Sequence, residues 1–380
     1  MKHKVFIERC YDYDAEKIYQ IIRTAVDKTA GIDVLKAAGK KVLIKPNILT
    51  AADPEEAVTT HPVFFEAVVR YFLENGFTVS AGDSPAVEKL SVCLKKNGYQ
   101  DIMDKYGIKT ADFINTVSID NPDGVLVKRF TVVKAVQDND LIINLPKLKT
   151  HSMMYHTGAM KNLFGLVKGL GKSKFHVRFP EKENFAGMIN DLNILVKPVF
   201  SILDAVVSMD GHGPRNGRPY NTGFIAAGMN ALAIDYASSS IIGYDPPELP
   251  VIKCALNRKN ENWISDKNDI EYPGLRPEEI SIAGFEKIEI LSDSGFIKNM
   301  MPPGLYNFIR NFIIPKPLID HEKCLRCRKC EEICAAGAAV FLKSENKIGI
   351  DYTKCITCYC CHEICPYGAI TLKKVFRKVR

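Results

Sequence analysis

Eight of the 12 cysteines in this 380-residue chain have the spacing of a metal-cluster site. They form two runs of C-x2-C-x2-C-x3-C, and the second run is followed by Pro366. Three thiolates at two-residue gaps hold three corners of a [4Fe–4S] cubane, and the fourth cysteine ligates the other cluster. The spacing therefore predicts crossed ligand sets. These are Cys324, Cys327, Cys330 and Cys365 for cluster 1, and Cys334, Cys355, Cys358 and Cys361 for cluster 2.

The repetition extends beyond the cysteines. Asp320 and Lys323 precede the first run at the same distances as Asp351 and Lys354 precede the second, and a Gly-Ala pair follows each run. Two such halves predict a small α+β ferredoxin-like domain with pseudo-twofold symmetry. Each half would supply a cluster loop, a short helix and a strand.

Structural zinc is the alternative, since paired C-x2-C units also make zinc sites. Zinc would use two pairs and leave the third cysteine and the x3-C ending without a role. Cys360, beside Cys361, is interpreted as a spare thiol because the regular spacing is complete without it. Cys10, Cys93 and Cys254 are scattered, and without a disulfide framework the compartment is expected to be reducing.

Composition and charge resemble those of ordinary soluble globular proteins with two or three domains. Apolar residues make up 46% and charged residues 25%, and a formal net charge of +7 permits acidic partners without requiring nucleic acid. The first residues lack the apolar core of a signal peptide. Polar residues within 224–243 favour a buried helix there over a membrane span. We expect a cytoplasmic protein of an anaerobic setting, with no membrane span and no nucleic-acid partner.

The first two-thirds of the chain alternates strand and helix patterns, which predicts an α/β layered domain with a largely parallel sheet. Strands are expected at residues 4–9, 41–45, 77–81, 141–145, 199–207, 280–283 and 287–291. Helices are expected at 15–26, 62–73, 185–197 and 230–241, and another after Ser84 as N-cap with Pro85 in its first position. The predicted domains are 1–292 and 319–380, joined by a proline-containing apolar linker at 293–318 with a short helix at 305–314.

Polar side chains follow several of these strands, and ligands of parallel sheets gather beyond the carboxyl ends of the strands. Taken singly, each lysine is more often a solvated surface charge, but convergence at strand ends favours a site. Several lysines beside aspartates predict a pocket for a carboxylate or phosphate. The candidate binding residues are Lys45, Asn47, Asp83, Lys147, Lys149, Lys161 and Asn162. The candidate proton-transfer residues are His151, Asp204 and Asp210.

Two glycine-rich segments approach nucleotide-binding motifs without matching them. Residues 165–173 resemble a phosphate-binding loop, but Leu166 stands where the first glycine is required. Residues 211–217 miss the dinucleotide fingerprint because the last glycine comes one residue late. Both are interpreted as turns that let the backbone approach a ligand or cross tightly, so neither ATP nor NAD is predicted.

Several of these segments resemble one family together. They are Lys45-Pro46-Asn47, Gly82-Asp83-Ser84-Pro85, Pro146-Lys147-Leu148-Lys149-Thr150-His151, Lys161-Asn162-Leu163-Phe164-Gly165, and Asp204-Ala205 with Gly211-x-Gly213-Pro214. The chain is similar to the domain-of-unknown-function family 362, in the form fused to a C-terminal two-cluster ferredoxin. The resemblance covers nearly the whole chain. It implies an iron–sulfur protein with a redox role and implies no particular substrate.

The sequence predicts an oxidoreductase or electron-transfer protein with two [4Fe–4S] clusters. The clusters would pass electrons between a redox partner protein and an anionic small molecule in the α/β domain. One alternative is a non-catalytic ferredoxin-type subunit that docks onto a larger redox complex. Another is a cofactor-assembly or metal-handling protein in which His151, His156 and either Asp83 or Asp210 hold a metal. The patterns leave open whether a flavin is bound and whether the chain forms a homo-oligomer.

Overall fold

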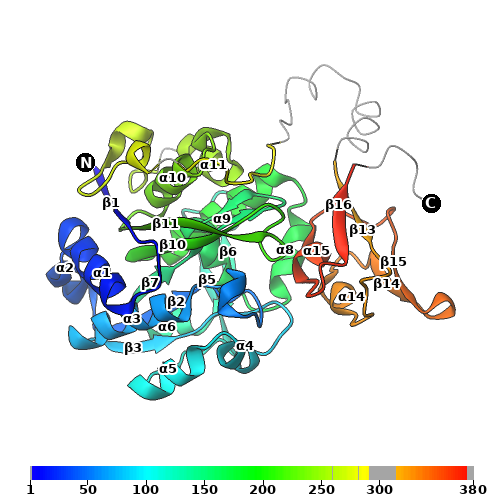
Figure 1. Ribbon diagram of the computed structural model, residues 1–380, viewed down its shortest axis with the longest axis horizontal. Coiled ribbons are helices and arrows are strands. Elements are labelled where there is room, and N and C mark those ends of the chain that lie inside the picture. Colours follow the sequence, from blue (N-terminus) through cyan, green and yellow to red (C-terminus); the bar gives the residue numbers. More distant parts are fainter. Residues whose placement is uncertain (1, 259, 281, 291–313, 375–380) are drawn as a thin grey trace. The chain divides into compact units, whose positions relative to one another are not determined.

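The computed structural model describes the chain apart from residues 1, 259, 281, 291–313 and 375–380 (Figure 1). The chain divides into two compact units. The first comprises Met1–Lys172 and Glu181–Ile288, and the second comprises Ser173–Pro180 and Glu289–Arg380. None of the helices in the described part is long and apolar enough to cross a membrane.

The first unit contains a mixed sheet in which most strands are parallel. Its order is β12-β1-β11-β10-β7-β2-β3-β4, and β8 and β9 extend it beside β10. The strands are β1 (His3–Arg9), β2 (Lys41–Pro46), β3 (Thr78–Ala81), β4 (Lys109–Thr110), β7 (Leu141–Leu145), β8 (Lys147–His151), β9 (Tyr155–Thr157), β10 (Phe200–Asp210), β11 (Arg218–Gly228) and β12 (Ile270–Glu271). β11 runs antiparallel to both β1 and β10, whereas β10, β7, β2, β3 and β4 run parallel. The predicted largely parallel sheet is confirmed.

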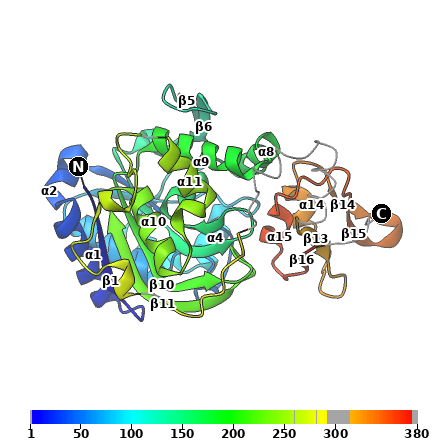
Figure 2. The ribbon, with the colours of Figure 1, turned by 90° about the horizontal axis from the view of Figure 1, so that it is seen from above.

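Helices cover both faces of this sheet (Figures 1 and 2). The larger helices are α1 (Ala15–Thr29), α3 (Pro62–Glu74), α5 (Tyr99–Tyr106), α9 (Lys182–Val196), α10 (Ala231–Ile241) and α11 (Pro250–Asn257). Successive strand residues point to opposite faces, so Val42 and Ile44 join the core formed with α1 and α3, whereas Leu43 joins the core with Leu163 and Leu166. Helix α1 begins where the side chain of Asp14 accepts a hydrogen bond from the Lys17 amide.

The strand order reverses at β2, and this reversal positions the candidate site. From β2 the chain adds β3 and β4 on one side, and then β7 and β10 on the other. In open parallel sheets, ligands bind outside the carboxyl ends of the strands at such a switch point. Lys45 and Asn47 lie at the carboxyl end of β2, next to the end of β7.

Four predictions for residues 1–291 are wrong. Residues 224–228 belong to β11, paired with β1 and β10, because a short apolar run does not distinguish a buried strand from a buried helix. No helix starts at Pro85: α4 (Leu90–Lys96) begins later, and the Ser84 hydroxyl accepts a hydrogen bond from the Gly169 amide at 2.8 Å instead. The described residues of 280–283 and 287–291 form no strand.

The second unit has two similar halves. β13 (Lys316–Ile319) pairs antiparallel with β16 (Ile370–Lys373), and β14 (Ala339–Leu342) pairs antiparallel with β15 (Lys347–Ile350). Each half also has a short helix, α14 (Lys329–Ile333) or α15 (Cys360–Ile364). The Asp320 amide donates to the Ala369 carbonyl at 2.7 Å, and the Asp351 amide donates to the Ala338 carbonyl at 2.8 Å. This reciprocal pairing is the predicted pseudo-twofold arrangement.

β13 starts at Lys316, inside the range that the sequence assigned to the linker. The linker helix expected at 305–314 lies, apart from its last residue, outside the described residues. The second unit also includes Ser173–Pro180, which contains most of α8 (Gly171–Arg178).

Candidate functional site

The two cysteine loops have the same unusual backbone. Arg326 and Arg328 flank Cys327 with φ angles of 55° and 62°, and Thr357 and Tyr359 flank Cys358 with φ angles of 54° and 65°. Left-handed residues between right-handed or extended ones turn successive N–H groups toward one point and form a nest for an anion. The conformation costs these non-glycine residues on the order of 1–2 kcal/mol each, so the surrounding structure must hold it in place.

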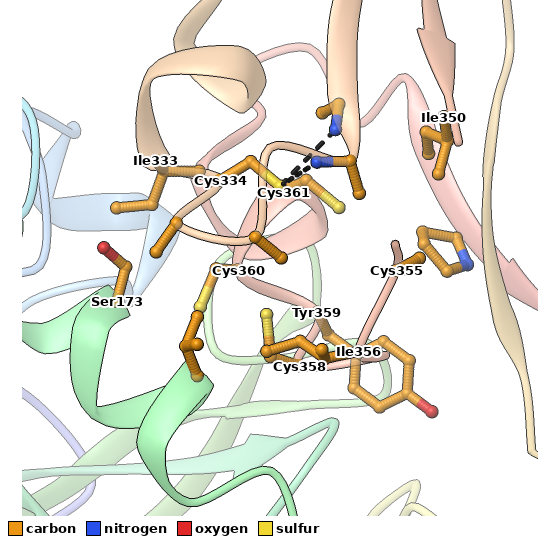
Figure 3. Close-up of a pocket in the computed structure, with 16 residues that line it drawn as sticks. Ser173, Ile333, Cys334, Ile350, Cys355, Ile356, Cys358, Tyr359, Cys360 and Cys361 are labelled. Carbon is orange, nitrogen blue, oxygen red and sulfur yellow. Dashed lines mark hydrogen bonds between the residues drawn. The ribbon is translucent and has the colours of Figure 1, made fainter. Parts of the chain in front are cut away.

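The eight cysteines line two cavities in the crossed sets that the spacing predicts. One cavity is lined by Cys324, Cys327, Cys330 and Cys365. The other is lined by Cys334, Cys355, Cys358 and Cys361 (Figure 3). We call them cavity 1 and cavity 2. Four thiols in each cavity, with a nest of N–H groups beside them, fit the ligand set of a [4Fe–4S] cluster.

Backbone amides already point at two of these sulfurs. The amides of Ala338 and Ala339 donate to Cys334 Sγ at 3.2 and 3.4 Å, and the Ala369 amide donates to Cys365 Sγ at 3.3 Å. Such bonds stabilise a thiolate and are one of the means by which a protein tunes a cluster potential. Cys360 also lines cavity 2 (Figure 3).

Burial and the neighbouring thiols raise the pKa of Cys330 to about 12. The cysteines that contribute are Cys324, Cys327 and Cys365, which agrees with their grouping in cavity 1. A coordinated metal reverses this effect, because its positive charge deprotonates the thiol outright.

The first unit has a buried polar network at the switch point of its sheet, which we call the Lys45 network. Lys45 Nζ forms an ion pair with Asp83 Oδ1 at 3.0 Å, and both side chains are buried. Asp83 also accepts hydrogen bonds from the amides of Ile48 at 2.7 Å and Ser84 at 2.8 Å. Burial lowers the pKa of Lys45, and the charge of Asp83 opposes that change.

Asn162, from α7 (Ala159–Asn162), connects this network to its neighbours. Its Oδ1 accepts hydrogen bonds from Lys45 Nζ at 3.1 Å and Asn47 Nδ2 at 3.0 Å, and its Nδ2 donates to Asn144 Oδ1 at 2.8 Å. Lys149 Nζ donates to Asn47 Oδ1 and to the Val58 carbonyl, both at 2.7 Å. The structure thus brings together five of the predicted binding residues, namely Lys45, Asn47, Asp83, Lys149 and Asn162. Most of their polar atoms, however, form hydrogen bonds or ion pairs with one another.

Lys147 belongs to a second buried group, which we call the Asp204 group. Lys147 Nζ lies 2.8 Å from Asp204 Oδ2 and 2.7 Å from Tyr13 Oη. Tyr13 donates to Asp204 Oδ1 at 3.0 Å, and the His61 amide donates to Asp204 Oδ2 at 2.9 Å. The rings of Tyr13 and His61 stack at 3.5 Å, and burial lowers the pKa of His61 to about 4. The charges of Lys147 and Asp204 therefore compensate each other.

The other two proton-transfer candidates, Asp210 and His151, form hydrogen bonds or ion pairs with neighbouring residues outside the Lys45 network. Asp210 is paired with Arg218, whose Nη2 lies at 2.8 Å, and also accepts from the Glu286 amide at 3.1 Å. His151 Nδ1 accepts hydrogen bonds from the amides of Met153 and Met154 at 3.0 and 3.2 Å. Neither contact places them in the Lys45 network.

The metal-handling alternative requires converging ligands. His156 Nε2 lies 3.5 Å from Ser238 Oγ, and burial lowers the pKa of His156 to about 3. Within the described ranges, no three His, Cys, Asp or Glu side chains converge closely enough to hold a single metal ion. His151, His156 and the aspartates therefore do not form the site that this alternative needs.

Lys172 is a functional candidate that the sequence reasoning missed. Its ammonium donates to the Ser84 carbonyl, and burial is the main reason that its pKa falls to about 7. The charge of Asp83 opposes this fall, whereas Lys45 and Lys161 add to it. We call Lys45, Lys161 and Lys172 the lysine cluster. The ammonium groups of Lys45 and Lys161 both act on Lys172, near the carboxylate of Asp83.

Gly165 explains why the glycine-rich segment approaches this cluster. A Cβ atom at this position would lie 2.1 Å from Asp83 Oδ1 and 2.6 Å from Lys45 Nζ. Only glycine allows that approach. The whole segment is not the turn that the sequence predicts, because Gly165 lies in a 3-10 helix (Leu163–Leu166) and Gly171 begins α8. Lys172 is the lysine of this near-miss motif, and that position was the available signal. Tyr13 and His61 gave no comparable signal, because His61 before Pro62 indicates a helix start.

Comparison with known proteins agrees with both units. The sequence matches the family described as a domain of unknown function (DUF362) over residues 42–240. It matches the family described as a 4Fe-4S dicluster domain over residues 316–366. The resemblance inferred from the motifs is therefore confirmed.

A relative among known proteins is the thylakoid-associated protein sll1697 of Synechocystis sp. It is 29% identical over 297 residues, which cover 78% of this chain and 91% of that protein. Among solved structures, the lactate racemase apoprotein of Thermoanaerobacterium thermosaccharolyticum matches with a TM-score of 0.39 and 14% identity. That match covers 62% of this chain and 58% of the racemase chain, and it is too distant to bear on function. Because the first family match extends over more than half of the chain, the protein belongs to the DUF362 family, and a 4Fe-4S dicluster domain follows at its C-terminal end.

Proposed function

We propose that this protein transfers electrons through two [4Fe–4S] clusters, between a partner protein and an anionic small molecule bound in the α/β unit. The observation that carries the proposal is the sorting of eight cysteines into cavities 1 and 2, each with one nest of N–H groups. When bound, the clusters would supply one-electron chemistry. The chain's part is to hold them by thiolates and to stabilise those thiolates through the amides of Ala338, Ala339 and Ala369. We keep the cytoplasm as the compartment, because the cysteines must stay reduced.

The lysine cluster is the part of the α/β unit that best supports an anionic ligand. Lys45 pairs with Asp83, and the charges of Lys45 and Lys161 both lower the pKa of Lys172, so three cations lie close enough to influence one another. Neighbouring ammonium groups of this kind favour a carboxylate or phosphate, which would accept charge-assisted hydrogen bonds. Lys172, with a pKa near 7, is suited to exchange a proton with such a ligand at neutral pH.

The substrate proposal also revises the candidate roles. Asp204 and Asp210 are paired with Lys147 and Arg218, and His151 accepts two backbone hydrogen bonds. Those contacts favour structural roles for all three. We therefore assign proton exchange to Lys172 and anion binding to the lysine cluster, with Asn47 and Asn162 as the residues that position Lys45 and Lys149.

Cluster content tests the first half of the proposal. Protein purified without oxygen should contain about eight iron and about eight sulfide ions per chain. The variants Cys327→Ser, Cys358→Ser and Cys365→Ser separate the two centres by electron paramagnetic resonance of the reduced protein. Because Cys365 lines cavity 1, Cys365→Ser should perturb the same signal as Cys327→Ser and not that of Cys358→Ser. Zinc in place of iron, or a Cys365→Ser spectrum like that of Cys358→Ser, would contradict the assignment.

Ligand binding tests the second half. A panel of small carboxylates and inorganic phosphate should contain an anion that raises the melting temperature of the α/β unit, since a ligand of the folded state stabilises it. Lys161→Ala and Lys172→Ala should abolish that shift. Lys168→Ala is the matched control, because Lys168 is an exposed lysine in the same segment. If no anion of the panel binds while both clusters are intact, the non-catalytic ferredoxin-type subunit becomes the better description.

A further inference from the structure

The two halves of the cluster domain repeat the same backbone but not the same charge. Cavity 1 is lined by three cations and no carboxylate, namely Arg326, Arg328 and Lys329. Cavity 2 is lined by apolar residues, cysteines, Ser173 and Tyr359, with no charged side chain among its described lining (Figure 3). The difference in charge makes cavity 1 the half that would attract a charged partner.

Cavity 1 also opens to the surface. Leu325 is 63% exposed and Tyr367 is 45% exposed, and both line this cavity. Cys327 is an exposed cysteine, whereas Cys358, its equivalent in the second half, is partly buried. We call Leu325, Arg326, Arg328, Lys329 and Tyr367 the cluster 1 face. An exposed apolar pair among cations is typical of a docking surface.

The charge of the cluster 1 face is only partly neutralised within the domain. Arg328 Nε lies 2.7 Å from Glu331 Oε2, and Glu331 Oε1 accepts a hydrogen bond from the Phe341 amide at 3.1 Å. That carboxylate is therefore held against its own chain. Arg326 forms no ion pair with any residue in the described part of the chain. A partner with acidic groups would complement it.

We propose that the cluster 1 face binds an acidic one-electron carrier protein, and that cluster 1 is the centre that exchanges electrons with it. The inference rests on the proposed function, because it assumes that cavity 1 holds a cluster. A carrier protein is favoured over a membrane or a nucleic acid because the cations surround an exposed cluster ligand, so that charge attraction brings the two redox centres together. Encounters of this kind use small interfaces and depend on electrostatic steering.

Rapid-mixing kinetics test the proposal with the full-length protein carrying its clusters. The probe is a reduced acidic ferredoxin, mixed with the oxidised protein without oxygen at low ionic strength. Arg326→Glu should lower the second-order rate constant of reduction about tenfold or more, because charge steering contributes at least that factor. The difference should shrink as added salt screens the charges. Lys347→Glu makes the same charge change on β15, outside both cavities, and should leave the rate near that of the unchanged protein.

Dithionite separates failure of this inference from failure of the proposed function. If dithionite reduces no cluster in the unchanged protein, the proposed function fails. If dithionite reduces every variant to the same extent but Arg326→Glu and Lys347→Glu slow the ferredoxin equally or not at all, the docking surface is refuted. Sedimentation with phosphatidylserine vesicles covers the membrane alternative. Vesicle binding that is lost in Arg326→Glu, with an unchanged ferredoxin rate, would replace the carrier by an anionic membrane surface.

Discussion

At the scale of single residues, Lys147 and Asp204 show that a lysine predicted to bind a ligand can instead be paired with a carboxylate of its own chain. Both side chains are buried, and Asp204 also accepts hydrogen bonds from Tyr13 and His61. Removing one member of such a pair leaves an uncompensated buried charge. The structure therefore predicts a loss of stability before any effect on binding.

We expect Lys147→Met to lower the free energy of unfolding of the α/β unit by about 3–5 kcal/mol. Adding Asp204→Asn to the same chain should recover part of the loss, because the amide removes the unpaired charge and still accepts hydrogen bonds. Urea unfolding followed by circular dichroism measures both effects. Lys168→Met, at an exposed position, is the control and should change little. A loss below about 1 kcal/mol for Lys147→Met would mean that the pair is solvated.

Lys172 gives a pH dependence whose sign follows from its surroundings. Burial is the first cause that lowers its pKa from 10.5 to about 7, so the side chain is charged below pH 7 and largely neutral above it. Affinity for an anion should therefore fall as the pH rises through about 7. Lys172→Arg keeps its charge throughout this range and should remove the dependence. Titration calorimetry with the anion found in the panel, between pH 6 and 9, measures it.

The same pKa contributes to stability in the opposite direction. Between about pH 7 and 10.5 the unfolded chain holds a proton on Lys172 that the folded chain has released. Stability from this group therefore rises with pH across that window. In the binding experiment, an affinity for the anion that stays constant from pH 6 to 9 in the unchanged protein would show that Lys172 keeps an ordinary pKa.

At the scale of elements, the cluster loops depend on left-handed residues in fixed places. Thr357 is β-branched and has a φ of 54°, a conformation that suits glycine better. Thr357→Gly should keep both clusters. Thr357→Pro fixes φ near −65° and should destroy the nest around cavity 2. Iron analysis should then fall from about eight to about four per chain.

The reduced Thr357→Pro protein should retain the electron paramagnetic resonance signal assigned to cluster 1. Arg326→Pro is the mirror experiment and should remove cluster 1 instead, because Arg326 holds the equivalent position in the first loop. If Thr357→Pro kept eight iron ions, the left-handed backbone would not be needed for cluster binding.

The sequence predicted elements best where local pattern and burial agree. The strand expected at 141–145 is β7, and the helix expected at 62–73 is α3, because an apolar run or a proline at the first helical turn determines each locally. It failed at 224–228, where alanines and glycine suit either a strand or a helix, and pairing with β1 and β10 decides. The prediction of Ser84 as a helix N-cap failed because its hydroxyl accepts a hydrogen bond from the amide of Gly169, which is distant in the sequence.

The same limit applies to the sites. The grouping of the cysteines was accessible because the repeated C-x2-C-x2-C-x3-C spacing is typical of crossed ligand sets. The partners of Lys147 and Lys149 were not, because they come from β10, from the N-terminal segment and from residues 47 and 58. Charge compensation among distant residues is a property of the folded chain. Strand ends therefore identified where the polar residues gather, but not which of them remain available.

At the scale of the whole molecule, the division into two units predicts that the α/β unit folds without the clusters. Its sheet and cores are built from residues before 289. A fragment of residues 1–290 should be soluble, show the circular dichroism of an α/β protein and unfold cooperatively. It should contain no iron. The full-length protein treated with a chelator is the control, and aggregation of the fragment alone would mean that the α/β unit needs the second unit to fold.

The exchange of Cys334 and Cys365 between the two halves has a consequence for biosynthesis. Cavity 1 takes its fourth thiol from residue 365 of 380, and cavity 2 takes one from the first run. A nascent chain that has emerged only through the first run therefore cannot complete either centre. The cysteine set of cavity 2 is complete once Cys361 has been translated and that of cavity 1 once Cys365 has, so a cluster bound in cavity 1 would mark a chain that extends at least to Cys365.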